Sequence, residues 1–353
     1  DRAEAAGQPP LFPLRDTYRV HRRTPAWSES QNDAAGENPE GGASIHYFLP
    51  EKAEDGVTLV IRDAAGEVVR ELENLKSGEG LHRTYWNLYK ERTPEVKLRT
   101  KPDEASHVQI GDRGWRRLSD GGRFSIFSPP GSYTVELKIG DEVVTSGALE
   151  VLKDPGSVGD ETEITAQMEL LTRLREMIVD SVEMINASEW SRRQLYDLRT
   201  AWKELRESDK VEADGAASTE TDTEAETGEE ATATEVSTEE EEPTDLLSMI
   251  EDVDGQLKEL EGLYFDLRLT GPGQDSLRWK RLLSSQLVRL AWGISGSDSR
   301  PTDSPLEFFA ELEEQVEAAR AQWARIRDES IPALNAFARE QGVEAVMLED
   351  PTD

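Results

Sequence analysis

Hydrophobic and polar positions alternate with a period of two through much of the first half of the chain. Between residues 57 and 62 the odd-numbered positions are aliphatic, and between 133 and 139 they are apolar while the even-numbered ones are polar. This spacing predicts β-strands with one buried face. Turn chemistry at Asp63–Gly66 and Gly140–Asp141 predicts hairpins. We expect further strands at 44–49, 67–72, 82–88 and 142–152, with Trp86 and Tyr133 in the core.

The period changes to 3.6 residues after Asp154. Apolar residues then recur at spacings of three and four from Ile164 to Leu205, which predicts a helix over about 161–206. Asp160 and Glu163 stand at the spacing of a capping box at its start. Such a helix would be about 70 Å long at 1.5 Å per residue. We therefore expect either a hairpin of helices or a break near Asn186–Ser188.

Helical periodicity returns after residue 244. Apolar positions step by three and four from Leu246 to Leu267, and similar stripes follow within 283–294 and 309–326. These stripes predict long helices that pack as an antiparallel bundle. Residues with known capping or helix-breaking preferences mark the helix ends: Gly271, Pro272, Asp275, Pro305, Pro332 and Gly342.

The patterns together predict an α+β multidomain fold, in which an antiparallel immunoglobulin-like β-sandwich is followed by an antiparallel α-helical bundle with a disordered acidic linker. The predicted boundaries are an extended lead-in at 1–43, the sandwich at 44–153, a long helical segment at 154–207, the linker at 208–244, the remaining bundle helices at 245–342 and a tail at 343–353.

Acidic residues dominate the composition. The segment 208–244 holds 14 acidic residues and one lysine, too few apolar groups to offset chain entropy, so it is expected to be disordered. The 353-residue chain has 73 acidic and 40 basic residues and a net charge of −33. This charge argues against nucleic acid and anionic membrane surfaces as partners. No apolar run approaches the ~20 residues of a transmembrane helix, so no direct membrane span is expected.

The sequence contains no constellation typical of an enzyme. Cysteine is absent, which excludes disulfides, thiol catalysis and Cys-ligated metals. The four histidines His21, His46, His82 and His107 are scattered, and none belongs to an HExxH motif. The nucleophile-elbow, phosphate-loop and dinucleotide-binding motifs are missing as well. We predict no enzymatic activity, no catalytic residue, no cofactor and no metal site.

The connection between residues 89 and 128 is the main candidate for a binding element, because it is long for a hairpin loop. It is locally basic and contains a tryptophan, and the lead-in adds a second one. The candidate partner contacts are Arg113, Trp115, Arg116, Arg117 and Trp27.

Several motifs resemble immunoglobulin-like domains of the flagellar hook-capping type. Val57–Arg70 is similar to that family's hairpin, in which a hydrophobic strand is followed by D-x-x-G and VR. Gly80–Leu88 resembles its G-x-N-R-x-x-W-D-L strand, with His82 and Asn87 in place of the usual Asn and Asp. Pro129–Val135 matches its P-P-G-x-Y-x-V strand.

The exit from this region also resembles the family. Lys153–Pro155 matches the x-D-P motif, although Gly156 replaces the usual Arg. The whole succession resembles the C-terminal tail of bacterial sortilin-like WD40/YVTN/BNR-repeat propeller proteins, and Leu11–Val20 and Gly271–Leu290 fit that tail too. The Asp-box pattern of the propeller, S-x-D-x-G-x-[TS]-W, is absent here. The resemblance implies an exported protein, periplasmic or extracellular, and a non-catalytic accessory tail.

Three functions are therefore open. The first is a non-catalytic binding or scaffolding module of an exported protein, which contacts a protein partner or a propeller domain in cis. The second is the accessory C-terminal part of a BNR/sialidase-like glycosyl hydrolase whose propeller is absent here. The third is a structural subunit of a cell-envelope or membrane-associated complex. A glycan ligand stays open as well, although no residue pattern supports it. The chain begins at Asp1 rather than Met, which indicates a fragment or a processed N-terminus.

Overall fold

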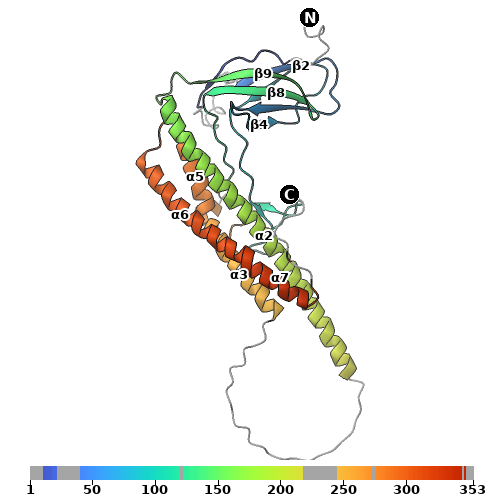
Figure 1. The fold of residues 1–353 in the computed structure, drawn as a ribbon. Coiled ribbons are helices and arrows are strands. Elements are labelled where there is room, and N and C mark those ends of the chain that lie inside the picture. Colours follow the sequence, from blue (N-terminus) through green and yellow to red (C-terminus); the bar gives the residue numbers. More distant parts are fainter. Residues whose placement is uncertain are drawn as a thin grey trace, which may run out of the picture. The chain divides into compact units, whose positions relative to one another are not determined.

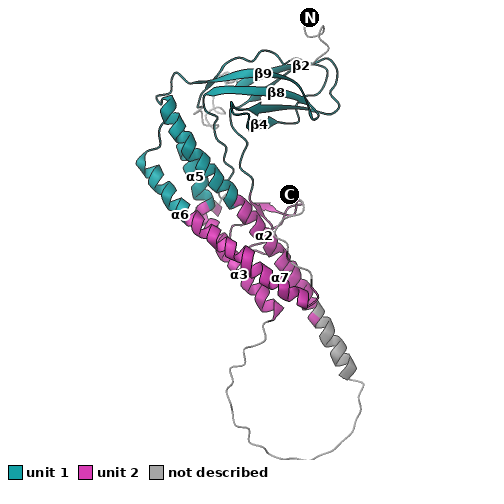
Figure 2. Ribbon diagram, viewed as in Figure 1, with its two compact units in different colours: residues 1–95, 121–181, 284–314 teal, residues 96–120, 182–283, 315–353 magenta. Residues whose placement is uncertain are grey.

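The computed structural model describes residues 11–21, 40–119, 122–217, 245–271, 275–343 and 346. Most of the predicted acidic linker (218–244) and the candidate contact Trp27 lie outside these residues. The chain divides into two compact units (Figure 2). Unit 1 comprises residues 1–95, 121–181 and 284–314, and unit 2 comprises 96–120, 182–283 and 315–353.

Strands and helices occur in both units. The strands of unit 1 are β1 (Thr17–Arg19), β2 (Ala43–Leu49), β3 (Val57–Arg62), β4 (Val68–Leu72), β5 (Gly80–Trp86), β8 (Gly131–Ile139) and β9 (Glu142–Lys153). Unit 2 contains β6 (Lys97–Leu98), β7 (Arg116–Arg117), α3 (Leu246–Tyr264), α4 (Asp275–Arg278), the π-helix η1 (Ile326–Ser330) and α7 (Ile331–Glu340). Nearly all of α5 (Leu283–Ile294) belongs to unit 1, while α2 (Glu161–Ala217) and α6 (Asp303–Arg325) contribute to both (Figure 2). Figure 1 labels the larger helices and strands along the chain.

The predicted fold class, an antiparallel immunoglobulin-like sandwich followed by a separate helical bundle, is wrong. The main sheet is a curled, mixed five-stranded sheet in the order β1-β9-β8-β3-β4, and β1 runs parallel to β9. The remaining strands form two-stranded sheets, β2-β5 and β6-β7. Helical residues pack within the same compact unit as the main sheet, and the β6-β7 pair belongs to the other unit. Short-range alternation could not predict this arrangement, because it carries no information on which strands pair or which helices join them.

The alternation is confirmed in β8, where Tyr133, Val135 and Leu137 are buried, whereas in β3 Val60 is buried as well as its neighbours on either side. In the antiparallel pair of β3 and β8, Leu59 lies opposite Leu137 and Ile61 opposite Val135, and all four side chains are fully buried. The β2-β5 pair contributes Trp86 to the same core, and its ring meets that of Tyr133 edge to face at 5.1 Å between centroids. Both aromatic residues are core residues, as the sequence predicts.

A buried ion pair holds the parallel strand β1 in unit 1. Arg19 at the end of β1 is fully buried, and its Nε donates to the carbonyl of Ser128 at 2.9 Å. Its guanidinium also pairs with Asp298, in the loop after α5. His21 Nε2 lies 2.6 Å from the same carboxylate. Burial lowers the pKa of Arg19 to about 10, so the arginine keeps its charge at neutral pH.

Helix α2 is continuous from Glu161 to Ala217, so the break predicted near Asn186–Ser188 is wrong. The helix also extends into the first residues of the predicted linker. The capping box at its start is confirmed, because Asp160 Oδ1 accepts from the N–H of Glu163 at 2.8 Å and Glu163 Oε2 accepts from the N–H of Asp160 at 3.0 Å. Asn186 and Ser188 do not interrupt the helix, since their side chains bind neighbouring elements instead of their own backbone.

The helical pattern of unit 2 follows the sequence closely. The stripe from Leu246 to Tyr264 is buried along α3. The chain stays helical through Pro332, but its hydrogen-bonding pattern changes there: α6 passes into the π-helix η1, and α7 begins with that proline in its first turn. Proline lacks the N–H that would continue the α-helical ladder, which accounts for the wider turn before it. None of the helices in the described ranges is long and apolar enough to cross a bilayer.

Truncating Trp86 should destabilise unit 1. We expect Trp86→Ala to lower the free energy of unfolding by about 3–5 kcal/mol, because it removes a large, fully buried ring from the core. Urea unfolding followed by circular dichroism measures the change. Leu81→Ala, in the same strand but with 64% of its surface exposed, is the matched control and should cost far less. Equal losses in the two variants would show that Trp86 is not part of the core.

Candidate functional site

The candidate contacts in the loop 96–120 have different environments. Arg113 is exposed and Trp115 is half-buried. Arg116 Nη1 donates to the carbonyl of Leu269, after α3, at 3.0 Å, and burial lowers the pKa of this arginine. The backbone of Arg117 pairs with that of Lys97 in the β6-β7 sheet. Within unit 2, Arg116 thus links this loop to the segment that follows α3.

Glu189 of α2 anchors the other end of this loop. Its Oε2 accepts from the backbone N–H groups of Arg99 and Thr100, at 2.6 and 2.7 Å. Its Oε1 accepts from the hydroxyl of Thr100 at 3.0 Å. One turn earlier on the same face of α2, Asn186 Oδ1 accepts from the N–H of Lys97 at 2.7 Å. Asn186 and Glu189, three residues apart on α2, thus accept hydrogen bonds from three backbone amides of a loop that has little regular secondary structure.

Arg192, one turn after Glu189, connects α2 to α3. Its guanidinium pairs with Glu261 and, at 2.9 Å through Nε, with Asp254. It also lies 3.8 Å from Glu189. Burial alone would lower the pKa of Arg192, but the three surrounding carboxylates outweigh it and the pKa is raised. The arginine is therefore permanently charged, and it is the positive centre of the network.

Glu261 is the acid of this network whose pKa is strongly raised. It is fully buried on α3, where its Oε1 accepts from the hydroxyl of Ser188 at 2.6 Å. Burial, together with the nearby charge of Glu189, raises the pKa of Glu261 to about 8, despite the opposing effect of Arg192 and Ser188. A glutamate with a pKa of about 8 is mostly protonated at pH 7, so it contributes little negative charge beside Arg192 until the pH approaches 8.

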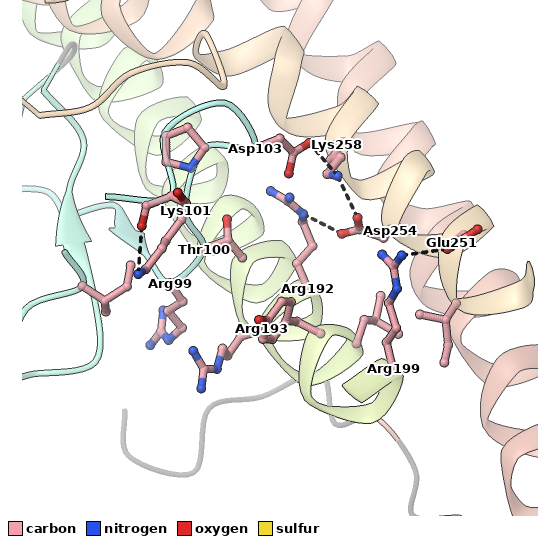
Figure 3. A pocket seen from close by; sticks show the side chains of 16 residues that line it. Arg99, Thr100, Lys101, Asp103, Arg192, Arg193, Arg199, Glu251, Asp254 and Lys258 are labelled. Carbon is pink, nitrogen blue, oxygen red and sulfur yellow. Dashed lines mark hydrogen bonds and ion pairs between the residues drawn. The ribbon is translucent and has the colours of Figure 1, made fainter. Parts of the chain in front are cut away.

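A pocket of about 520 Å³ opens beside this network in unit 2 (Figure 3). We call it the basic cleft. Six basic and three acidic residues line it, in a chain whose acidic residues far outnumber its basic ones. The basic residues are Arg99, Lys101, Arg192, Arg193, Arg199 and Lys258, and the acidic ones are Asp103, Glu251 and Asp254.

Ion pairs within unit 2 position the cations of the basic cleft. Lys258 Nζ lies 3.0 Å from both Asp103 and Asp254, so it joins α3 to the loop 96–120. Arg199 Nη2 lies 3.0 Å from Glu251 of α3. These pairs are partly exposed, and each contributes little to stability by itself. Their main effect is to orient cationic groups along the cleft.

The chemistry available in the basic cleft is the recognition of anions. The perturbed acid Glu261 is fully buried and does not line the cleft, so a substrate there would not reach its carboxyl group. Glu189 is 1% exposed, and both of its oxygens bind the loop. Guanidinium and ammonium groups facing a cavity are donors to carboxylates, phosphates or sulfates. Across the described ranges, no three His, Cys, Asp or Glu side chains come together in a group that could hold a metal ion.

Sequence reasoning missed the residues that build this site. A signal was nevertheless present, because Glu261 falls on the apolar stripe of α3 between Leu257 and Tyr264, at spacings of four and three. Glu189 and Arg192 likewise continue the buried face of α2 between Ile185 and Leu195. Charged residues on a buried stripe need partners of opposite charge or hydrogen bonds, so these positions predict mutual pairing.

No known protein family, curated protein or solved structure matches this chain. The likeness to the tail of sortilin-like propeller proteins therefore remains a prediction from sequence motifs.

Replacing Glu261 should remove a pH dependence of stability. Because the pKa of Glu261 rises from its ordinary 4.5 to about 8 on folding, the folded state retains a proton that the unfolded state releases. This contribution is complete below pH 4.5 and is lost as the pH rises to about 8, at no more than about 1.4 kcal/mol per pH unit. Glu261→Gln keeps a hydrogen-bonding side chain of the same size, and its free energy of unfolding should fall less over this range.

The measurement is urea unfolding of both proteins at pH 5, 6, 7 and 8. The difference between the pH profiles of the two proteins isolates the contribution of Glu261, because every other titrating group is present in both. Glu259→Gln, which removes an exposed carboxylate from the same helix, is the matched control and should follow the wild-type pH profile. If Glu261→Gln also followed the wild-type profile, the raised pKa would be refuted.

Proposed function

We propose that the chain is a non-catalytic binding or scaffolding module of an exported protein, which contacts a protein partner or a propeller domain in cis. The observation that most supports this proposal is where the charged side chains of unit 2 lie. The buried carboxylates of Glu189 and Glu261 bind the loop 96–120, Ser188 and Arg192, while the groups that face the basic cleft are predominantly cations. Such a cleft is suited to holding an anionic partner rather than to transferring a proton.

The proposed periplasmic or extracellular location rests on the resemblance to sortilin-like proteins. The high acidity is compatible with it, because a dense negative surface keeps a protein hydrated and limits nonspecific association. A partner that binds such a chain tightly must present either positive charge to the acidic surfaces or negative charge to the basic cleft.

The absence of catalysis is directly testable. The purified chain should not turn over sialosides, other glycosides or model esters. The reason is that Glu261, whose pKa is strongly raised, is fully buried and out of reach of a substrate. Initial rates on such a panel, with any activity followed through a second purification, provide the measurement. Saturable turnover that stays with the chain and disappears in Asp254→Asn, a carboxylate that does line the cleft, would contradict the proposal.

A further inference from the structure

We propose that the basic cleft binds an acidic peptide segment of a partner protein, through Lys101, Arg193 and Arg199. This inference rests on the proposed binding role and names the chemistry of the partner. Its basis is the hydrogen-bonding capacity, the spacing and the apolar surroundings of these three cations in unit 2.

The first observation is that the exposed arginines retain free donors. Arg193 pairs through Nε with Asp197, one turn away, at 3.1 Å, and Arg199 pairs through Nη2 with Glu251 at 3.0 Å. A guanidinium has five N–H donors in a planar fork, so a single contact leaves most of them available to a second carboxylate. The two side chains are 48% and 43% exposed, and a ligand in the cleft can reach them.

Lys101 adds a third cation, and its hydrogen-bond partner is an uncharged carbonyl group. Its Nζ donates to the carbonyl of Ser106 at 3.3 Å, within the same loop. A carbonyl orients the ammonium without cancelling its charge. An incoming carboxylate would therefore gain a full charge interaction there, which is stronger than the hydrogen bond already made.

The spacing of the cations favours a chain of carboxylates over a single small anion. Arg193 and Arg199 are six residues apart on α2, which is about 9 Å along the helix axis. In an extended peptide, side chains two residues apart share one face and are separated by about 7 Å, and the length of the Arg and Glu side chains can make up the remaining distance. A short run of Asp or Glu residues can therefore place one carboxylate near each arginine. A single phosphate or free carboxylate carries less charge than such a run and has fewer oxygens to share between the two guanidinium groups.

The rest of the cleft lining is suited to the peptide's apolar atoms. Ile110 is half-buried at the cleft and exposes apolar surface, whereas Leu195 and Ile250 are buried beneath it. Tyr196 lies between the two arginines in the sequence of α2 and is 65% exposed. An exposed tyrosine beside cations provides a flat apolar surface with a polar end, a combination common at protein contact sites. Figure 3 shows the arginine side chains extending from the α2 ribbon, Arg199 toward Glu251.

The test measures the binding of a fluorescently labelled hexaglutamate peptide to the full chain by anisotropy. We expect saturable binding that weakens as salt is raised, and no comparable binding of hexalysine at the cleft. Arg193→Gln with Arg199→Gln should raise the dissociation constant about tenfold or more, because two charge-assisted contacts are lost. The assay is repeated with residues 218–244 replaced by a Gly/Ser linker, so that the chain's own acidic residues do not compete with the probe.

The matched control is Arg320→Gln with Arg327→Gln. These arginines also belong to unit 2, are similarly exposed and pair with the local carboxylates of Glu317 and Asp328, but they do not line the cleft. This variant should bind hexaglutamate within about twofold of the wild-type chain. Circular dichroism confirms that both double variants remain folded.

Three results would overturn the inference. They are no hexaglutamate binding by either form of the chain, equal losses in the two double variants, or binding of chondroitin sulfate through Arg193 and Arg199 without binding of hexaglutamate. The last result would assign the cleft to a sulfated glycan instead. None of these results involves turnover, so failure of this inference is distinguishable from failure of the non-catalytic role.

Discussion

The carboxylate of Glu189 organises unit 2, because it binds a segment that has little regular structure of its own. The loop 96–120 contains only the two-residue strands β6 and β7. Its amides need acceptors, and Glu189 and Asn186 of α2 provide them. The hydrogen bonds from the loop and the nearby guanidinium of Arg192 offset the cost of burying the Glu189 side chain. It can therefore sit beside Arg192 and contribute to the network that joins α2 to α3.

This arrangement explains how a chain with a net charge of −33 presents a basic cleft. Acidic side chains are directed inward to the loop and to Arg192, where hydrogen bonds and opposite charge offset the cost of their burial. Arg193 and Arg199 extend from α2 on the cleft side with most of their donors unused. The long-range field of the protein repels anions, and only a ligand that reaches several cations at once gains enough at short range to bind.

Local patterns predicted the elements but not their assembly. The structure confirms three local features: the alternation from Tyr133 to Leu137, the stripe from Leu246 to Tyr264 and the capping box at Asp160. The parallel strand β1 was missed because it is three residues long and its pairing with β9 spans most of unit 1. The candidate site was missed for a related reason: Glu189, Arg192 and Glu261 acquire their roles only when α2, α3 and the loop meet, although their places on buried stripes gave a usable signal.

The most direct test of this account is amide hydrogen exchange at Arg99 and Thr100, measured by NMR. Both amides donate to Glu189 in a loop that is otherwise short of regular hydrogen bonds. The account predicts strong protection of the two amides in the wild-type chain. It also predicts loss of that protection in Glu189→Leu, which removes the acceptors but keeps a side chain of similar size, while amides in the middle of α3 stay protected. Rapid exchange of Arg99 and Thr100 in the wild-type chain, or unchanged protection in the variant, would contradict it.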